Sequence, residues 1–225
     1  MVVRELNSWS VSPSEALNIQ ETLKKKLVLK KIKKNIHLLA GADVSYSKKN
    51  RKLYAAVTVM TFPELNEVEE ATAGGDIHFP YIPGLLSFRE APILARAFKK
   101  IRRVPDVVIF DGQGIAHPRG MGLATHMGLM LDVPSIGCAK SRLFGTYEKI
   151  GNTAGDFSFL KADGMIVGVA LRTRTNIHPI FVSPGYKTDI PGCIETIINT
   201  CRGYRIPEPI RQAHLLANQR RMKEL

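Results

Sequence analysis

The chain has 225 residues, 44% of them hydrophobic, which is enough apolar material for one sizeable core, so we expect a single domain spanning residues 1–225. No apolar run approaches the ~18 residues of a membrane span, and the first residues lack a signal-peptide core, so we expect a soluble, cytoplasmic, monomeric protein without a membrane partner. The three cysteines are odd in number and lack CxxC spacing, which indicates buried thiols rather than a disulfide framework or a zinc site.

The net charge of +12 is concentrated at the two ends of the chain. Residues 1–52 contain twelve lysines and arginines against four acidic residues, and the chain from Arg202 onward contains six against two. Lysine and arginine release counterions when they bind phosphates, so this distribution suits a nucleic acid. A solvated, lysine-rich helix face would give the same excess, and charge alone does not decide between the two.

The first predicted element is a helix. Ser12 is placed to cap it, Pro13 occupies the first helical position and Glu15 completes a capping box, after which residues 17–27 supply an apolar stripe opposite lysines. After a KKIKKN connection at 30–35, three runs read as strands joined by turns short enough for an antiparallel meander. These strand-like runs are residues 37–47, 52–62 and 66–77.

A proline-rich turn, FPYIPG, separates this meander from a second half in which helices and strands alternate. The predicted helices there are residues 85–103 (with Pro92 inside), 120–132, 189–201 and 207–222, and the predicted strands are 105–114, 133–141, 165–173 and 179–185. Three antiparallel strands followed by strand–helix–strand crossovers predict an α/β fold, with a mixed sheet whose later strands are parallel to the first and with helices on its faces. Ligands in such sheets bind at strand ends, where the connection direction switches.

Three acidic residues fall where this fold would place a site. Asp43 lies within the first predicted strand, Glu90 on the following helix, and Asp111 ends the strand run VVIFD. Each has an ordinary explanation on its own, but a carboxylate in an apolar strand costs free energy unless a positive partner compensates it. Together the three form an oxygen-lined site that suits Mg²⁺ or Mn²⁺. Such an ion polarises a phosphoryl oxygen and activates water, so a basic protein with this site indicates a metal-dependent nuclease.

Several long motifs in this order closely resemble endonuclease V. They are GADVSY, PYIPGLLSFRE, VIFDGQGIAHPRGMGLATHMGL, IGCAKSRL, FVSPG and RIPEPIRQAH, and the resemblance as a whole extends over residues 13–214. The resemblance implies a ribonuclease H-like fold, a role in DNA repair and a need for Mg²⁺, which Mn²⁺ can replace. It implies cleavage of DNA, or of RNA, at the second phosphodiester on the 3′ side of inosine, leaving a 3′-hydroxyl and a 5′-phosphate.

The same resemblance implies roles for individual residues at the site. Asp43 and Asp111 match the metal-binding aspartates, and Glu90 matches the helix carboxylate beside them. His214 matches a position on the last helix from which an imidazole would orient or deprotonate the attacking water. Lys140 matches a lysine that would stabilise the scissile phosphate in the transition state.

The proline-rich turn resembles the wedge that this family inserts beside the lesion. Two prolines stiffen the turn around Tyr81, Ile82 and Pro83, so little entropy is lost on binding and the Tyr81 ring can stack on a base. A damaged base must leave the stack before a pocket can distinguish hypoxanthine from adenine. By resemblance, the residues that form this base pocket or lie near it are Gly84, Leu86, Gly112, His117, Gly122, Leu123 and His126.

Other interpretations remain open from the sequence. A nucleic-acid-binding module without catalysis would explain the charge but not the three acids. A junction resolvase or a nuclease for RNA–DNA hybrids would share the fold, and an inosine-specific ribonuclease would share the motifs. The loop GQGIAHPRGMG suggests a nucleotide-binding protein only weakly, because it lacks GxGxxG spacing.

Overall fold

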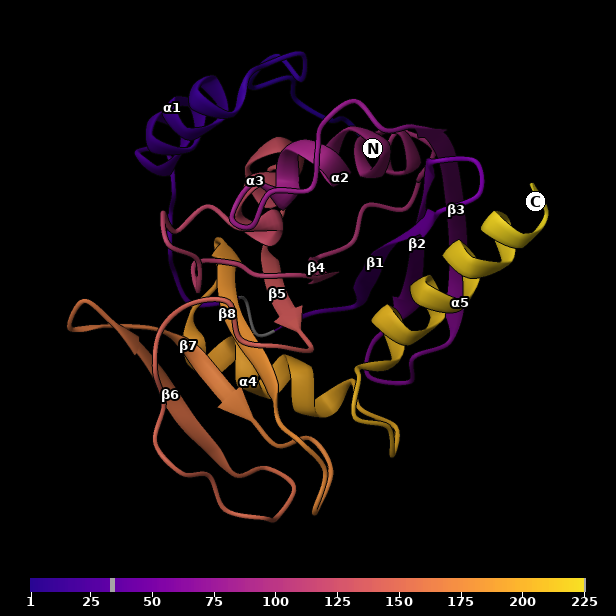
Figure 1. The fold of residues 1–225 in the computed structure, drawn as a ribbon. Coiled ribbons are helices and arrows are strands. Elements are labelled where there is room, and N and C mark those ends of the chain that lie inside the picture. Colours follow the sequence, from indigo (N-terminus) through magenta and orange to yellow (C-terminus); the bar gives the residue numbers. More distant parts are fainter. Residues whose placement is uncertain (33–34, 225) are drawn as a thin grey trace.

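A single mixed β-sheet organises the chain (Figure 1). The structure is a computed structural model that describes residues 1–32 and 35–224, so Lys33 and Lys34 of the KKIKKN connection lie outside the described residues. Its strands are β1 (Leu38–Ser47), β2 (Lys52–Thr61), β3 (Glu67–Asp76), β4 (Val107–Asp111), β5 (Ser135–Ala139), β6 (Phe157–Ala162), β7 (Met165–Leu171) and β8 (Ile180–Tyr186). They lie side by side in the order β3-β2-β1-β4-β5-β8-β7-β6.

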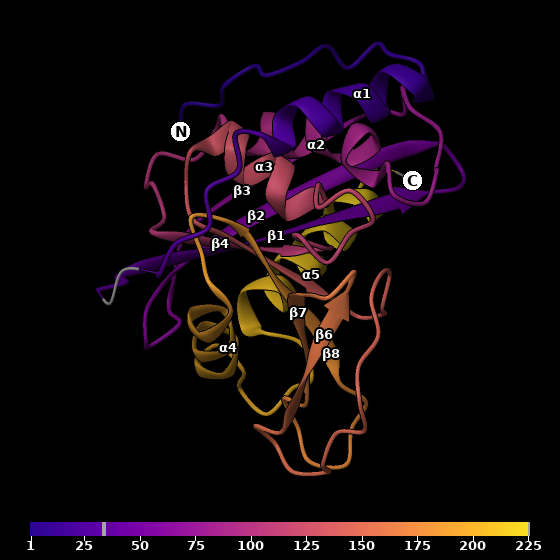
Figure 2. The same ribbon diagram turned by 90° about the vertical axis from the view of Figure 1, so that its left-hand side faces the viewer.

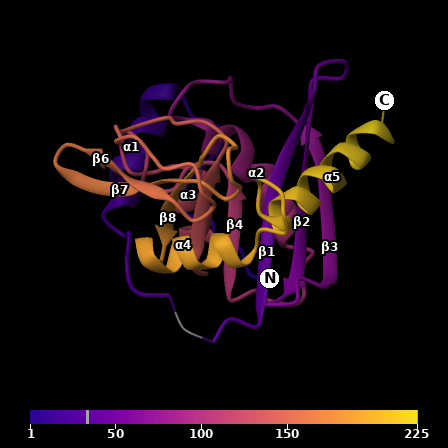
Figure 3. The same cartoon turned by 90° about the horizontal axis from the view of Figure 1, so that it is seen from below.

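The helices cover both faces of this sheet. They are α1 (Pro13–Lys24), α2 (Leu86–Phe98), α3 (Leu123–Leu131), α4 (Ile190–Asn199) and α5 (Glu208–Met222). Figure 2 shows α2 and α3 on one face with α1 outside them, while α4 and α5 lie on the other face. Seen from below, α5 crosses the β1–β3 end of the sheet and β6 and β7 form the opposite end (Figure 3). In the described part of the chain, no helix is long and apolar enough to cross a membrane.

The register of β1 against β4 determines where the acidic residues meet. β1 pairs antiparallel with β2 and parallel with β4, and the last parallel pair joins Ala42 to Phe110. One step further along both strands come Asp43 and Asp111, so the two aspartates are neighbours across adjacent strands. The pairing of β1 with β4 therefore produces a carboxylate pair at the end of β4.

Helix α5 packs directly on this part of the sheet. A side chain at Gly41 would place its Cβ 2.1 Å from the Pro209 backbone, so only glycine permits this approach. The hydroxyl of Thr58 on β2 donates a hydrogen bond of 3.0 Å to the Pro209 carbonyl. These contacts fix the first turn of α5 against β1, and the helix then carries His214 past Asp43.

The predicted fold class is confirmed, with differences in detail. The capping box of Ser12 and Glu15 is present as predicted. The second helix ends at Phe98 rather than near Arg103, because the backbone amides of Arg102 and Arg103 turn away to bind the Glu69 carboxylate. β5 runs parallel to β4 as expected, whereas β8 is antiparallel to β5, and β6 is a strand that the sequence pattern did not indicate.

Candidate active site

Asp43 and Asp111 occupy the carboxyl end of β4, where α5 and the segment after β5 converge. The Asp43 carboxyl group is only 8% exposed, and its Oδ1 accepts a hydrogen bond of 2.7 Å from the Val44 amide. Burial and the nearby charge of Asp111 raise the pKa of Asp43, while His214 and the Val44 amide oppose the shift. The charge of Asp111 therefore makes the ionised form of Asp43 less favourable in the absence of a cation.

Asp43 is linked to α5 by a hydrogen-bond network of three further side chains, those of His214, Asn218 and Ser45. Nδ1 of His214 lies 2.6 Å from Asp43 Oδ2, and the amide of Asn218, one helical turn further on, lies 2.9 Å from His214 Nε2. The Asn218 carbonyl oxygen accepts a bond of 2.8 Å from the Ser45 hydroxyl. The contacts fit the His214 tautomer that carries its proton on Nδ1, which donates to Asp43 while Nε2 accepts from the Asn218 amide. The network thus orients the imidazole and the Asp43 carboxylate together.

Glu90 approaches the two aspartates from α2. Burial together with the charges of Asp43 and Asp111 raises its pKa to about 8, despite the opposing charge of Arg89. A carboxylate whose ionisation is opposed by two neighbouring carboxylates lies in a region of strong negative potential. The structure therefore brings the three predicted acids close enough to influence one another electrostatically.

Lys140 sits at the end of β5 and pairs with Asp111. Burial works against its charge, but the attraction of Asp111 and Asp43 prevails and raises the Lys140 pKa, so the ammonium group stays charged near neutral pH. Because its side chain is still 46% exposed, the ammonium remains accessible to a phosphate arriving from solvent. The predicted catalytic lysine is thus held beside the aspartate pair.

The donor set suits a hard divalent cation. A cation between the three carboxylates would stabilise the ionised forms of Asp43 and Glu90, whose pKa values are raised by burial and by neighbouring carboxylates, and oxygen donors are those that Mg²⁺ and Mn²⁺ prefer. Among residues 1–32 and 35–224, however, no three His, Cys, Asp or Glu side chains already stand as a closed metal-binding cluster. Lys140 and His214 instead occupy one carboxylate oxygen each, so a cation would enter by displacing or sharing these contacts.

The proline-rich turn is anchored by its flanks and exposes one ring. Tyr81 is 68% exposed, whereas Phe79 is 2% exposed and packs its ring 5.7 Å from that of Phe88. Ile82, expected to project together with Tyr81, instead packs against the cluster that contains Phe79 and Phe88. Pro83 is exposed beside it. The turn therefore presents the Tyr81 ring between two exposed prolines, Pro80 and Pro83, from a base that is fixed in the core.

Gly84 is the point at which the turn is clamped. Its carbonyl lies 3.0 Å from the Gln20 amide nitrogen, 2.9 Å from His117 Nε2 and 2.9 Å from Arg119 Nη2. Burial lowers the pKa of His117 to about 4, so the ring is neutral and donates from Nε2. Gly84 itself has φ +80°, a backbone conformation that favours glycine. A Cβ added at this position would also lie 2.8 Å from Arg119 Nη2 and would displace that side chain.

The other residues expected at the base pocket lie around the loop that follows β4. Gly112 lies against the Leu123 side chain, and Gly122 precedes α3 with its amide bonded to the Gly114 carbonyl. Leu86 lies on α2 one turn before Glu90 and is half-buried.

His126 is positioned differently from these residues. It is fully buried between Trp9 and Phe88, and Ser87 and Asn7 occupy its two ring nitrogens. Its side chain therefore supports the core and offers no surface to a base.

Three residues of the site were missed in the sequence. Gln20 is a polar residue at a buried position of α1, in step with Ala16 and Leu23, and that break in the apolar stripe was its only signal. Asn218 follows His214 by four residues on α5, the spacing at which helical side chains meet. Arg119 gave no signal, because its role depends on the fold of the loop around it.

The family model described as Endonuclease V matches residues 21–215 of this chain. A relative from Methanothrix thermoacetophila, named endonuclease V, is 47% identical over 220 residues, covering 98% of this chain and 97% of its own length. The solved structure of endonuclease V from Streptomyces avermitilis is 36% identical with a TM-score of 0.90, covering 100% of this chain and 99% of that one. Endonuclease V from Ciona intestinalis, solved in complex with a 23mer DNA containing an inosine followed by a ribo-adenosine, is 25% identical with a TM-score of 0.83 and covers 96% and 100% of the two chains.

Proposed function

This chain belongs to the endonuclease V family and is therefore an endonuclease acting on phosphodiester bonds, and we propose that it cleaves nucleic acid beside deaminated adenine. The proposed cut is at the second phosphodiester on the 3′ side of inosine, and it leaves a 3′-hydroxyl and a 5′-phosphate. The physiological role that follows is repair of DNA in which adenine has become hypoxanthine. The homologous Ciona intestinalis protein was solved with inosine-containing DNA, which supports DNA as the partner.

The observation that carries the proposal is the convergence of five side chains at the end of β4. Asp43 and Asp111 are neighbours across β1 and β4, and their charges reach Glu90. Lys140 pairs with Asp111 and His214 pairs with Asp43. A binding module without catalysis would have no use for three partly buried acids that destabilise one another.

Asp43, Asp111 and Glu90 are the residues that would hold a divalent cation, Mg²⁺ or in its place Mn²⁺. When bound, such an ion polarises the phosphoryl oxygen and makes water acidic enough to supply hydroxide near neutral pH. The chain itself supplies the geometry, because Asp43 is fixed by the Val44 amide and by His214. A rigid carboxylate frame keeps the attacking and leaving oxygens in line without reorganisation during the reaction.

Lys140 and His214 contribute charge and orientation to the hydrolysis. Water attacks phosphorus, the bond from phosphorus to the 3′ oxygen breaks, and the proton lost by the water balances the one gained by the 3′ hydroxyl. Negative charge develops on the phosphoryl oxygens during attack, and the charged Lys140 ammonium stabilises it. His214 contacts Asp43 through Nδ1 and Asn218 through Nε2, so it orients Asp43, and its Nε2 can accept a proton from the attacking water once Asn218 moves aside.

The clamped turn accounts for lesion recognition. The Gly84 carbonyl is fixed by Gln20, His117 and Arg119, so Tyr81 is projected without loss of entropy on binding. Its exposed ring stacks on a base beside the lesion and holds the strand open, while the inosine base turns into the pocket of Leu86, Gly112 and Leu123. Hypoxanthine and adenine present opposite donor and acceptor orders at N1 and C6. Fixed backbone groups in the pocket can therefore reject adenine by leaving polar atoms unpaired.

The test is a nicking assay on end-labelled oligonucleotides with Mg²⁺ or Mn²⁺. The substrates are DNA with a single inosine, the same sequence as RNA, and undamaged controls of both. We expect one cut, one nucleotide beyond inosine, and none in the controls. Absence of any inosine-directed cut in both nucleic acids would overturn the proposal.

RNA is kept as the second candidate substrate because the nucleotide after inosine in the Ciona intestinalis complex is a ribonucleotide. The same assay decides this point through the ratio of cleavage rates on the two inosine substrates. Four-way junctions and RNA–DNA hybrids serve as further substrates, since preferential cutting of either would indicate a different nuclease of the same fold.

A further inference from the structure

A hollow opens next to the candidate active site, on the side away from the wedge turn. It is about 320 Å³ in volume, and its lining residues are Lys140, Tyr147, His178, Pro179, Phe181 and Arg205. Lys140 belongs to both the hollow and the active site, so the two are continuous. None of the described residues that line the hollow is acidic, although Asp111 lies just beyond Lys140. An anionic ligand that reaches Lys140 would therefore meet further positive charge in the hollow.

Tyr147 forms the aromatic wall of this hollow. Its ring meets Phe181 edge-on, with centroids 5.6 Å apart and an interplanar angle of 65°, and the residue is 37% exposed. The guanidinium carbon of Arg142 lies 5.9 Å from the centre of the Tyr147 ring. An exposed aromatic ring supported by a buried one and flanked by a cation is the arrangement on which single-stranded bases stack.

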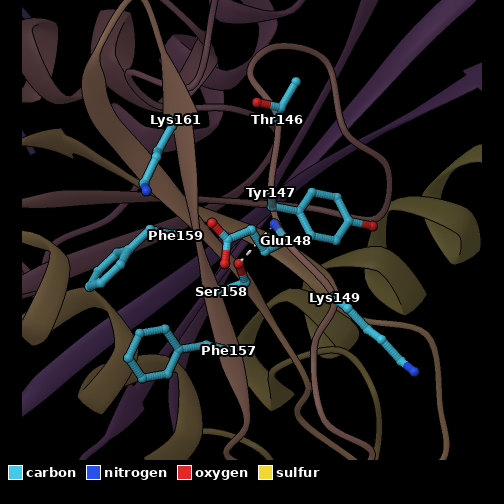
Figure 4. A pocket seen from close by; sticks show the side chains of 8 residues that line it. All are labelled: Thr146, Tyr147, Glu148, Lys149, Phe157, Ser158, Phe159 and Lys161. Carbon is cyan, nitrogen blue, oxygen red and sulfur yellow. Dashed lines mark hydrogen bonds between the residues drawn. The ribbon is translucent and has the colours of Figure 1, made fainter.

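The backbone around Tyr147 fixes the direction of its side chain. The segment pairs with β6 through a bridge between Thr146 and Lys161, and the amide of Glu148 bonds to the Ser158 hydroxyl. Side chains of an extended segment alternate between its two sides. Figure 4 draws a neighbouring pocket that shares Tyr147 with the hollow, and in it Tyr147 and Lys149 point to one side, whereas Phe157 and Phe159 of β6 point to the other. The two phenylalanines therefore lie outside the hollow.

Arg205 brings a second fixed cation to the hollow. Its Nη2 donates to the Lys140 carbonyl at 2.7 Å and to the Pro179 carbonyl at 2.8 Å. The Thr173 hydroxyl holds the Arg205 carbonyl at 2.6 Å. The guanidinium is thus tied to the backbone of the active-site lysine, and its charge is in place before any ligand arrives.

The position of the hollow relative to the wedge determines which part of a substrate reaches it. The wedge turn is tied to α1 through Gln20, and Figure 2 shows α1 on the opposite side of the molecule from β6 and β7. A strand whose inosine is held near Gly84, and which is cut on the 3′ side of that base, runs toward the carboxylates and continues past Lys140. The segment beyond the cut then enters the hollow.

We propose that this hollow binds the single strand on the 3′ side of the cut, with a base stacked on Tyr147 and phosphates near Arg205 and near Lys149, which lies beside the hollow and points to the same side as Tyr147. The inference rests on the proposed function, because it takes the direction of the strand from the position of the cut. It adds a binding subsite for the downstream nucleotides. Substrates with a longer 3′ flank should therefore bind more tightly and be cut more efficiently at low concentration.

The test compares two inosine substrates with the full-length protein. The short one ends one nucleotide beyond the cut, and the long one continues for about six more nucleotides. The measured quantity is the ratio of kcat/KM for the long substrate to kcat/KM for the short one. We expect a ratio of about 5 to 100 for the wild type, the contribution of one stacked base. Tyr147→Ala should bring the ratio close to one, whereas Phe159→Ala, on the other side of the segment, should leave it unchanged.

A matched pair of lysine variants tests the charge contribution. Lys149→Ala should reduce the slope of log affinity against log salt concentration for the long substrate by about one, and Lys161→Ala, which points away, should not. A Tyr147→Ala variant that lowers both kcat/KM values equally would show a merely structural role, and an unchanged ratio would show that the strand leaves by another path. Either result overturns the inference and leaves the proposed function intact. If the wild type cuts neither inosine substrate, the proposed function itself fails.

Discussion

Replacement of Gln20 by methionine tests how the wedge is held. Gln20 is 0% exposed, and its amide makes three contacts: donation to the Gly84 carbonyl at 3.0 Å, donation to the Met121 carbonyl at 3.1 Å, and acceptance from Arg119 Nε at 2.5 Å. Methionine has nearly the same length and shape but offers none of these bonds. The substitution therefore separates hydrogen bonding from packing.

The size of the effect follows from the partners left behind. The Gly84 carbonyl keeps His117 and Arg119 as donors, so it remains satisfied. The Met121 carbonyl and the Arg119 Nε each lose a partner in a buried or half-buried position, at about 1–3 kcal/mol per group. Greater apolar burial by methionine offsets part of this, so we expect the free energy of unfolding to fall by about 2–4 kcal/mol.

The assay is urea unfolding combined with hydrogen exchange of the Leu85 amide, which bonds to the Ile82 carbonyl within the turn at 2.9 Å. Glu21→Met serves as the matched control, because Glu21 is the next residue on the same helix but is exposed. We expect Glu21→Met to behave as the wild type and Gln20→Met to lose both global stability and protection of the turn. Wild-type stability with full protection in Gln20→Met would refute the role of this residue as a clamp.

Three further predictions concern other parts of the site and core. Tyr81→Ala should weaken binding to inosine-containing DNA by about 1–3 kcal/mol, while its binding to undamaged single strands should stay within about 0.5 kcal/mol of the wild type. Both affinities are measured by fluorescence anisotropy, and equal losses on the two DNAs would contradict the role of Tyr81 as a wedge. Asn218→Ala should lower kcat by about 10- to 100-fold with KM unchanged, because His214 loses the hydrogen-bond partner that fixes its tautomer. An unaltered kcat would contradict a role of Asn218 in positioning His214. Burial lowers the pKa of His126 to about 4, so as pH falls below about 6.5 the unfolded chain takes up the proton first, and this residue should account for about 2 kcal/mol of the stability lost between pH 7 and pH 5. Urea unfolding of His126→Gln at several pH values should show a correspondingly smaller loss, and an unchanged pH dependence would contradict the assignment.

Much of the site could be predicted because its residues violate a local pattern. Asp43 is a carboxylate inside an apolar strand, and Asp111 ends an apolar run. Both carboxylates therefore need positively charged or hydrogen-bonding partners, and no such residues lie next to them in the sequence. Connection rules predict that the later strands run parallel to the first, and the structure adds that β1 and β4 are adjacent, which brings the two aspartates together. The proline-rich turn can also be predicted from the sequence, because two prolines restrict the backbone in any surroundings.

What could not be predicted depends on contacts between distant segments. Ile82 was expected at the tip with Tyr81, but the cluster around Phe79 and Phe88 can bury it, and no local signal reveals that cluster. The same holds for β6, where Phe157 and Phe159 point outward and the alternation is inverted relative to an ordinary edge strand. Arg119 and Arg205 are ordinary surface cations by sequence, and only the fold turns them toward carbonyl groups.

The central claim is that Asp43, Glu90 and Asp111 form a cation site at which inosine-directed cleavage occurs. The most direct measurement is the rate of nicking of inosine-containing DNA against Mg²⁺ concentration for the wild type, Asp43→Asn and Asp111→Asn. Asp76→Asn, at the exposed end of β3, is the matched control. The account predicts that cleavage requires Mg²⁺, that both site variants lose at least about 100-fold in rate while still binding the DNA, and that the control cuts as the wild type does. Cleavage that survives in Asp43→Asn or Asp111→Asn, or that proceeds at full rate in excess EDTA, would contradict it.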